Sequence, residues 1–256
     1  VISNYAVGFD NIDIPAATQR GIPVGHTPGV LTDTTADFAF ALLMAAARRV
    51  VEGDKYTRAG KWQTWGPKLL LGPDIHGATL GLVGFGRIGK AMAKRASGFD
   101  MKVLYYDPII KDDPEAAALG AQSADLDTVL SQSDFISVHT PLTPDTRHLI
   151  NATALAKMRS EAIVINTARG PVVDHDALYE ALKSGQIAYA ALDVTDPEPI
   201  PMDSPLLTLD NIIIAPHIAS ASVATRDKMA EMAAANLLAG LKGEPLPTCV
   251  NPELYK

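Results

Sequence analysis

A short apolar segment that runs into a glycine-rich turn and then a helical pattern constrains this chain more than any other feature. The apolar segment is Thr79–Val83, the turn at 84–89 reads GFGRIG, and the helical pattern covers Ile88–Ser97. In G-x-G-x-x-G, the first glycine permits a tight turn, the second lets a ligand approach the backbone, and the third lets the helix pack on the strand. The context predicts a strand–turn–helix unit whose free helical N–H groups bind the pyrophosphate of a dinucleotide.

The rest of the middle of the chain alternates short apolar runs with helical patterns. Strands are predicted at 102–106, 135–138, 162–166, 188–194 and 212–215, and helices at 125–132, 152–158 and 176–184. Such alternation produces parallel βαβ units with right-handed crossovers. Together with 79–83, the six strands predict an α/β fold with a doubly wound parallel sheet of the Rossmann type.

Two longer helices are predicted outside this region. One covers 33–51, capped by Asp33 or Thr34 and apolar on most faces, so we expect it to be buried between layers. The other covers 222–241, with Gly243 just past its end. Residues 59–74, which contain two tryptophans, two prolines and three glycines, are predicted to form a loop.

Asp107 lies at the end of the strand that follows the glycine-rich unit. A carboxylate there can accept hydrogen bonds from both ribose hydroxyls and would repel a 2′-phosphate, so we expect NAD rather than NADP. The structural alternative is that the glycines only make a tight turn and that Asp107 caps the turn before Pro108.

Composition excludes several classes of function. The formal charge is −7, from 22 basic and 29 acidic side chains, so nucleic acid is not an expected partner. The single cysteine, Cys249, fits a reducing compartment such as the cytoplasm. The longest strongly apolar stretch, 38–47, is too short to span a membrane, and the six histidines lack the spacing of metal ligands. Because the sequence starts at Val1 inside a predicted strand, we expect it to be truncated at its N-terminus.

Three unusual polar residues follow three of the predicted strands. Arg169 follows 162–166, Glu198 follows 188–194, and His217 follows 212–215. Because the carboxyl ends of parallel strands share one sheet edge, these side chains can converge. Taken singly, Arg169 could pair with a surface carboxylate, Glu198 could be a solvated loop acid, and His217 could satisfy a backbone carbonyl.

Together the three side chains have a chemical logic. A guanidinium binds a carboxylate with two parallel hydrogen bonds, as Arg169 would hold a 2-keto acid. An imidazole exchanges protons near neutral pH, and a nearby carboxylate fixes its tautomer and stabilises its charged form. Beside a nicotinamide, His217 paired with Glu198 would supply the proton when the keto group is reduced.

At these residues the chain resembles the D-isomer-specific 2-hydroxyacid dehydrogenase family, and within it the glyoxylate/hydroxypyruvate reductase subgroup. The matching segments cover nearly the whole chain; they are NYAVGFDNID (4–13), TPGVLTDTTAD (27–37), LGLVGFGRIGKAMAKRASGF (80–99), HTPLTPDTRHLI (139–150), INTARGPVVD (165–174), ALDVTDPEP (191–199), APHIASAS (215–222) and CVNPE (249–253).

The resemblance implies an NAD(P)H-dependent reductase of glyoxylate or hydroxypyruvate that forms the D-2-hydroxy acid, usually as a homodimer. It implies a flavodoxin-like substrate domain, here incomplete, from residues 1–50 (with the interdomain helix) and 219–256, around a dinucleotide-binding domain at 70–218. The Val7 and Gly8 amides would bind the substrate carboxylate with Arg169, and Trp65 would border the substrate pocket. His139 would be structural, and His26 stands where the family often has Asn. The implied cofactor contacts are Thr35, Gly84, Phe85, Gly86, Arg87, Ile88, Gly89, Asp107, Thr140, Pro141, Thr146, Thr167, Ala168, Asp193 and Ala219.

A second hypothesis remains open. The same fold serves NAD-sensing transcriptional corepressors, which resemble this chain in Arg169, Glu198 and His217 as well. The absence of an extended tail after Lys256 favours the enzyme. No G-x-S-x-G segment is present, so a serine hydrolase is not expected.

Overall fold

The structure is a computed structural model that describes residues 1–111 and 113–255. The chain divides into two compact units. The central unit is Thr35–Ala219, and the terminal unit combines Val1–Thr34 with the residues from Ser220 onwards.

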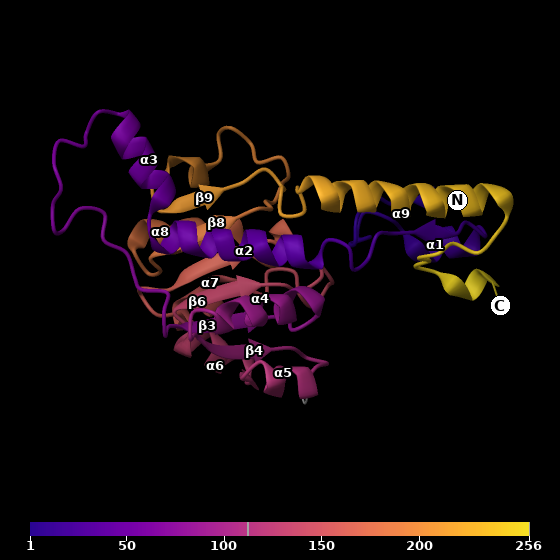
Figure 1. Cartoon of the computed structure of the whole chain (residues 1–256), viewed down its shortest axis with the longest axis horizontal. Helices are drawn as coiled ribbons and strands as arrows, with labels where there is room; N and C mark the ends of the chain where they lie inside the picture. Colours follow the sequence, from indigo (N-terminus) through magenta and orange to yellow (C-terminus); the bar gives the residue numbers. More distant parts are fainter. Residues whose placement is uncertain (112, 256) are drawn as a thin grey trace. The chain divides into compact units, whose positions relative to one another are not determined.

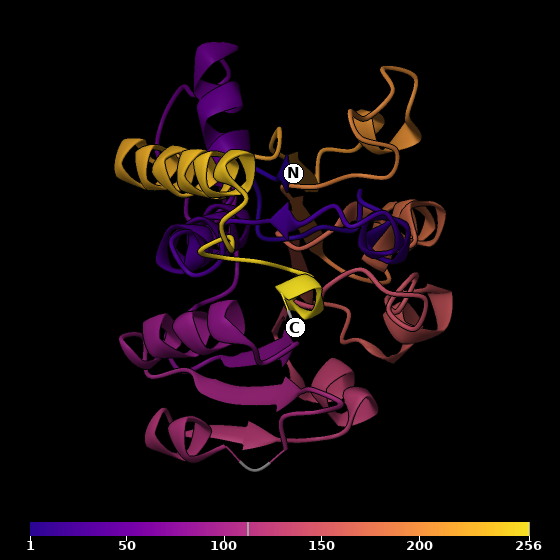
Figure 2. The same cartoon turned by 90° about the vertical axis from the view of Figure 1, so that its right-hand side faces the viewer.

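The central unit is built on a parallel sheet with the strand order β5-β4-β3-β6-β7-β8-β9 (Figures 1 and 2). The order reverses between β3 and β6, which creates a crevice at their carboxyl ends, where ligands bind in such sheets. This confirms the predicted doubly wound sheet. The strands are β3 (Thr79–Val83), β4 (Lys102–Tyr106), β5 (Ala121–Ser123), β6 (Phe135–Val138), β7 (Ile163–Asn166), β8 (Tyr189–Leu192) and β9 (Ile212–Ile214).

Four of the helices that the structure describes in the central unit begin at a capping side chain. Asp113, Asp125, Asn151 and Asp174 each accept a hydrogen bond from a first-turn N–H group. The helices are α2 (Thr32–Ala47), α3 (Val50–Arg58), α4 (Arg87–Ser97), α5 (Pro114–Ala118), α6 (Leu126–Gln132), α7 (Ala152–Lys157) and α8 (His175–Ser184), with short 3₁₀ turns at Gly170–Val172 and Pro205–Thr208.

Alternating residues of each strand face two separate cores. Leu80, Leu82 and Phe135 pack against α2 and α4 in one core. Ile136 and Val164 belong to the other core, which α6, α7 and α8 cover. Because strand residues alternate between faces, the central strands are buried on both sides and read as continuous apolar runs.

The long helix predicted at 33–51 is wrong in its extent. The helix ends at Ala47, Arg49 adopts a left-handed backbone with φ 51°, and α3 begins at Val50. The Arg49 guanidinium binds both carboxylate oxygens of Glu52, at 2.8 and 2.7 Å, and the carbonyl of Leu71. Asp33 and Thr34 lie inside α2 rather than before it, so neither is its N-cap. Burial of α2 is confirmed for eight of its residues.

The segment between α3 and β3 is the loop that the sequence predicts. Residues 59–74, all of which are described, form neither helix nor strand. Trp62 and Trp65 are 61% and 78% exposed. Two large apolar side chains in water cost free energy unless a partner covers them.

The terminal unit joins both ends of the chain. It contains β1 (Ile2–Ser3) parallel to β2 (Val24–Gly25), α1 (Ile14–Gln19), α9 (Val223–Lys242) and a 3₁₀ turn at Pro252–Tyr255. The buried Asn236 side chain bonds to Thr248, and a Cβ at Gly25 would overlap it, so Gly25 lets β2 approach α9. Within residues 1–111 and 113–255, no helix is both long and apolar enough to cross a membrane.

Candidate active site

The last three strands of the sheet end level with one another. Asn166 at the end of β7 pairs with Leu192 at the end of β8, and Leu192 pairs with Ile214 at the end of β9. The loops that follow these strands carry Arg169, Glu198 and His217. The parallel register therefore brings three segments that are distant in sequence to one edge.

His217 and Glu198 are in direct contact. Nδ1 of the imidazole lies 2.6 Å from Oε1 of the carboxylate, and the two side chains are 49% and 41% exposed. A bond of this length is short for a nitrogen–oxygen hydrogen bond. Because this bond occupies Nδ1, proton exchange with a bound molecule would use the other ring nitrogen, Nε2.

The backbone at His217 is held in an unusual conformation by Asp193. His217 has φ 55°, and its N–H donates to the Asp193 carbonyl at 2.9 Å. The Asp193 carboxylate then accepts the N–H groups of Ile218 at 2.8 Å and Ala219 at 2.7 Å. Burial raises the pKa of the Asp193 carboxyl, and these two N–H groups oppose that shift. The resemblance implies a cofactor contact for Asp193, with a capped strand end as the alternative, and these hydrogen bonds add a role at the turn of His217.

The loop that carries Glu198 is closed by hydrogen bonds of its own. The Thr195 hydroxyl donates to the Pro197 carbonyl at 2.8 Å, and the Thr195 N–H donates to Oε2 of Glu198 at 3.3 Å. The peptide bonds before Pro197 and Pro199 are cis. The Asp196 N–H donates to Nδ1 of His175 at 3.3 Å. Both oxygens of Glu198 therefore have partners, one on the loop and one on His217.

Arg169 is positioned by the buried side chain of Asn166. The Asn166 amide accepts the N–H of Ala168 at 3.0 Å and donates to the carbonyl of Arg169 at 2.9 Å. At the next residue, a Cβ on Gly170 would overlap the Thr195 carbonyl. Arg169 thus lies in a turn that packs directly on the loop that carries Glu198. Asn166 has no signal in the sequence beyond its place at a strand end.

The glycine-rich turn has the geometry of the pyrophosphate-binding turn that the sequence predicts. Gly84 has φ 99°, and a Cβ there would overlap the main chain of His139. A Cβ on Gly89 would overlap the Gly84 carbonyl, whereas a Cβ on Gly86 would enter open space. That open space lies at the N-terminus of α4, where a pyrophosphate would meet free N–H groups. The residues present therefore fit a dinucleotide.

The Asp107 carboxylate is hydrogen-bonded to the glycine-rich turn. Oδ2 accepts the N–H of Phe85 at 2.9 Å, and Oδ1 accepts the N–H groups of Ile109 and Ile110, both at 2.9 Å. The capping role that the sequence offered as an alternative is therefore present, and it leaves about one lone pair, on Oδ2, for a ribose hydroxyl. The Phe85 ring is buried and stacks on Tyr105 at 3.9 Å, so only the backbone of Phe85 faces the turn.

Several other predicted cofactor residues lie near the carboxyl ends of the strands. In the described chain, Thr140 after β6 and Thr167 after β7 each bury a hydroxyl that has no hydrogen-bond partner. Unsatisfied buried hydroxyls are unfavourable unless a ligand pairs with them. The Thr146 hydroxyl instead donates to the Pro141 carbonyl at 2.6 Å, which folds that loop. Thr35 is buried in the first turn of α2.

His139 is a poor proton donor in this fold. It is partly buried, its Nε2 lies 2.9 Å from the Ser137 hydroxyl, and desolvation of the ring lowers the pKa of its imidazole to about 3. The ring is therefore neutral near pH 7, which agrees with the structural role expected for it.

Val7 and Gly8, whose amides are predicted to bind the substrate carboxylate, lie in the terminal unit. The Gly8 carbonyl accepts the Asn4 amide at 2.7 Å, and the Val7 carbonyl is 3.0 Å from Nδ1 of His26. His26, whose effect the sequence left open, thus contributes to the conformation at Val7.

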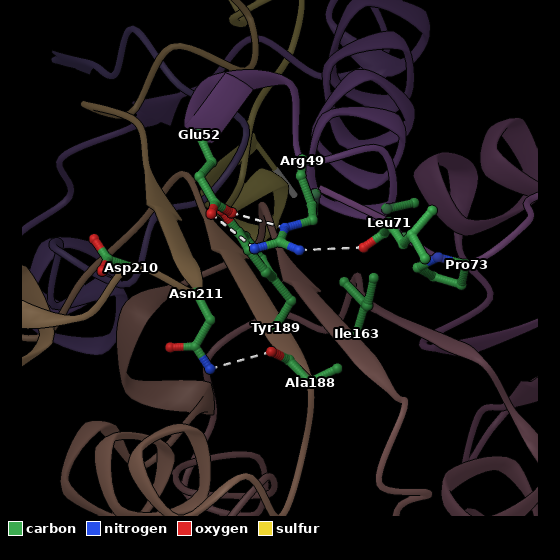
Figure 3. A pocket seen from close by; sticks show the side chains of 12 residues that line it. Arg49, Glu52, Leu71, Pro73, Ile163, Ala188, Tyr189, Asp210 and Asn211 are labelled. Carbon is green, nitrogen blue, oxygen red and sulfur yellow. Dashed lines mark hydrogen bonds and ion pairs between the residues drawn. The ribbon is translucent and has the colours of Figure 1, made fainter. Parts of the chain in front are cut away.

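The cavity in Figure 3 does not coincide with any of these residues. It is lined by Ile163, Ala188 and Tyr189 at the amino ends of β7 and β8, opposite to the edge that carries His217. Its Arg49 and Glu52 side chains bind each other. Among the residues that the structure describes, no group of three His, Cys, Asp or Glu side chains could hold a metal ion.

Comparison with known proteins identifies close relatives. Residues 40–219 match the family described as D-isomer specific 2-hydroxyacid dehydrogenase, NAD binding domain. The chain is 57% identical to a glyoxylate reductase of Korarchaeum cryptofilum over 100% of this chain and 77% of that protein. The TT0316 protein of Thermus thermophilus has a similar structure, with a TM-score of 0.90 and 52% identity over 96% of this chain and 77% of that one.

A third relative bears on the choice of cofactor. The NADPH-dependent glyoxylate/hydroxypyruvate reductase SmGhrB of Sinorhizobium meliloti, whose structure contains NADP and malonate, has a TM-score of 0.88. It is 35% identical to this chain and covers 97% of it, with 76% of its own chain matched. This fold therefore does not by itself select NAD over NADP.

Proposed function

Since this chain belongs to the D-isomer specific 2-hydroxyacid dehydrogenase family and is an NAD(P)-dependent oxidoreductase that reduces a 2-keto acid, we propose that its substrate is glyoxylate or hydroxypyruvate. The product is the 2-hydroxy acid, of D configuration where it is chiral. The observation that carries the proposal is the 2.6 Å contact between His217 and Glu198 at the end of the sheet.

His217 is the proposed proton donor. Its Nδ1 faces Glu198, so Nε2 gives its proton to the carbonyl oxygen of the substrate. Glu198 stabilises the imidazolium before this transfer and fixes which nitrogen faces the substrate. Asp193 positions the imidazole, because it holds the left-handed turn from which the imidazole projects.

Arg169 is the proposed anchor for the substrate carboxylate. A guanidinium binds a carboxylate through two parallel hydrogen bonds, which fixes both the position and the plane of the 2-keto acid. The Val7 and Gly8 N–H groups are further proposed ligands of a keto-acid carboxylate, and the terminal unit is the proposed substrate domain. Bound in this way, the carbonyl oxygen is polarised by positive charge.

The cofactor is proposed to bind along the crevice of the central sheet. Gly84, Gly86 and Gly89 hold its pyrophosphate at the start of α4, and Asp107 binds its ribose, which favours NAD. When bound, the cofactor supplies the hydride that adds to the carbonyl carbon. The buried hydroxyls of Thr140 and Thr167 support contacts along this route.

We also propose that the enzyme is a homodimer in a reducing compartment such as the cytoplasm. Val50, Trp62, Trp65 and Leu71 are large, exposed, apolar and close in sequence, as is typical of a surface that a second copy covers. The single cysteine suits a reducing environment. Light scattering coupled to size-exclusion chromatography measures the number of copies directly, and a monomer would contradict the dimer.

The function is tested by NADH oxidation in the presence of glyoxylate or hydroxypyruvate. We expect turnover by the intact enzyme and a loss of at least about 100-fold in His217→Ala, since general acid catalysis contributes about 10²–10⁴-fold. His76→Ala is the matched control. His76 is exposed, its Nε2 lies 3.0 Å from a carboxylate oxygen of Asp100, and it is at the opposite end of the strands from the proposed site. NADH binding without turnover of any small 2-keto acid would contradict the proposal.

A further inference from the structure

The loop between β8 and Glu198 contains a buried hydroxyl with a defined partner. Thr195 is 6% exposed, and its Oγ1 donates to the Pro197 carbonyl at 2.8 Å. The bond closes a turn two residues long immediately before Glu198. Since a buried hydroxyl loses its hydrogen bonds to water, this contact stabilises one conformation of the turn over the alternatives.

The same residue contacts the Glu198 carboxylate through its backbone. The Thr195 N–H donates to Oε2 at 3.3 Å, while Oε1 faces Nδ1 of His217 at 2.6 Å. A carboxylate held at both oxygens cannot rotate freely about its last bond. Thr195 thereby helps to fix the orientation of the Glu198 carboxylate relative to the imidazole.

The turn is fixed to the rest of the central unit on its other side. The Asp196 N–H donates to Nδ1 of His175 at 3.3 Å, and Gly170 packs against the Thr195 carbonyl. Burial lowers the pKa of the His175 imidazole, which keeps the ring neutral and Nδ1 available as an acceptor near pH 7. With these anchors fixed, the Thr195 hydroxyl bond joins the anchored part of the loop to the part that carries Glu198.

We infer that Thr195 is a positioning residue for the Glu198–His217 pair: its hydroxyl closes the turn that aims the carboxylate at Nδ1 of the imidazole. The inference rests on the proposed function, in which that pair prepares the proton donor. Thr195 touches neither substrate nor cofactor in this role and acts only through Glu198.

The test replaces Thr195 with valine, which keeps the shape and removes the hydroxyl. We expect kcat for glyoxylate reduction by the intact enzyme to fall about tenfold, a part of the general acid contribution, while the Kd for NADH changes less than about twofold. Thr195→Ser, which restores the hydroxyl, should recover most of kcat. Thr208→Val is the matched control, since its hydroxyl donates to the Pro205 carbonyl at 2.7 Å in an exposed turn.

A double-mutant cycle tests whether Thr195 acts through Glu198. In a Glu198→Gln background, Thr195→Val should lower kcat by less than about twofold further, because the two changes disturb the same contact. An equal tenfold loss in both backgrounds, or a Thr195→Val enzyme with wild-type kcat, would overturn the inference. Should valine prevent folding, Thr195→Ala removes the hydroxyl without adding a methyl group, and the same pattern is expected.

A spectroscopic signal separates this inference from the proposed function. An imidazole N–H bonded to a carboxylate gives a far-downfield proton resonance, which His217→Gln identifies by removing it. We expect Thr195→Val to shift or broaden this resonance and Thr195→Ser to retain it, whether or not glyoxylate is reduced. An unchanged resonance in Thr195→Val would overturn the inference, while absence of turnover by the wild type would overturn only the proposed function.

Discussion

Gly170 lies so close to Thr195 that a methyl group at position 170 would overlap the Thr195 carbonyl. This contact joins the turn after β7, which carries Arg169, to the loop after β8, which carries Glu198. The proposed carboxylate anchor and the partner of the proposed proton donor are therefore connected through main-chain packing.

Gly170→Ala should lower the free energy of unfolding by about 1–3 kcal/mol, because the added methyl group has no space. It should also lower kcat/KM for the keto acid, because the two loops move apart. Thermal unfolding and steady-state kinetics measure the two effects. Gly53→Ala is the control, since its nearest contact would be 3.8 Å away and alanine favours a helix; equal behaviour of the two variants would contradict the packing argument.

Arg169→Lys should lower kcat/KM for glyoxylate by about 10- to 100-fold, the equivalent of losing one charge-assisted hydrogen bond. Lysine keeps the positive charge but cannot supply two parallel N–H groups to a carboxylate. Initial rates over a range of glyoxylate concentrations measure the change. Arg159→Lys, at an ion pair of 3.0 Å with Asp134, serves as the control. Near-normal kinetics of Arg169→Lys would exclude the anchor role.

Asp107→Ala should raise the KM for NADH more than that for NADPH, because alanine neither accepts the ribose hydroxyls nor repels a 2′-phosphate. The variant should also melt at a lower temperature, since the N–H groups of Phe85, Ile109 and Ile110 lose their acceptor. Equal changes in both KM values together with a lower Tm would assign Asp107 to the turn alone.

Asp193→Asn should destabilise the turn at His217. An amide has only one oxygen, so it presents N–H to the backbone N–H of either Ile218 or Ala219. We expect the free energy of unfolding to fall by about 1–3 kcal/mol and kcat to fall with it. Denaturant unfolding and turnover measure these changes. A variant with wild-type stability would contradict the role of Asp193 in holding this turn.

Stability should decline as the pH falls from 6.5 towards 3. The pKa of His139 is about 3 in the folded protein, whereas the unfolded chain has the ordinary value of 6.5. Between these values only the unfolded state binds the proton, so acid favours unfolding by up to about 1.4 kcal/mol per pH unit. His139→Gln should reduce this slope in denaturant titrations. Burial lowers the pKa of His175 as well, so His175 adds to the slope that remains.

The local patterns predicted most of the sheet. Strands at 79–83, 102–106 and 135–138 were predicted with the bounds that the structure has, because an apolar run buried on both faces differs clearly from its neighbours. The strand β5 was not predicted, since three residues carry too little pattern. The break between α2 and α3 was also missed, because Arg49 takes its conformation with Glu52 and the distant Leu71 as partners.

The candidate site divides in a similar way. Arg169, Glu198 and His217 were predicted from residue type and strand position, and their roles stay predictions. The sequence did not predict the roles of Asn166 and Thr195, or the hydrogen bonds by which Asp193 holds the turn at His217. Each of these side chains binds main-chain groups, and a main-chain partner leaves no mark in the sequence.

The sequence alone determined the strand–glycine–helix unit and the order of the elements, because both depend on residues close together in the chain. Only the tertiary structure decided that Nδ1 of His217 faces Glu198, 19 residues away, and that Asp193 holds the turn at His217. A bond of 2.6 Å depends on how the ends of β8 and β9 align and how their loops close. That alignment results from packing across the whole sheet, which no local pattern contains.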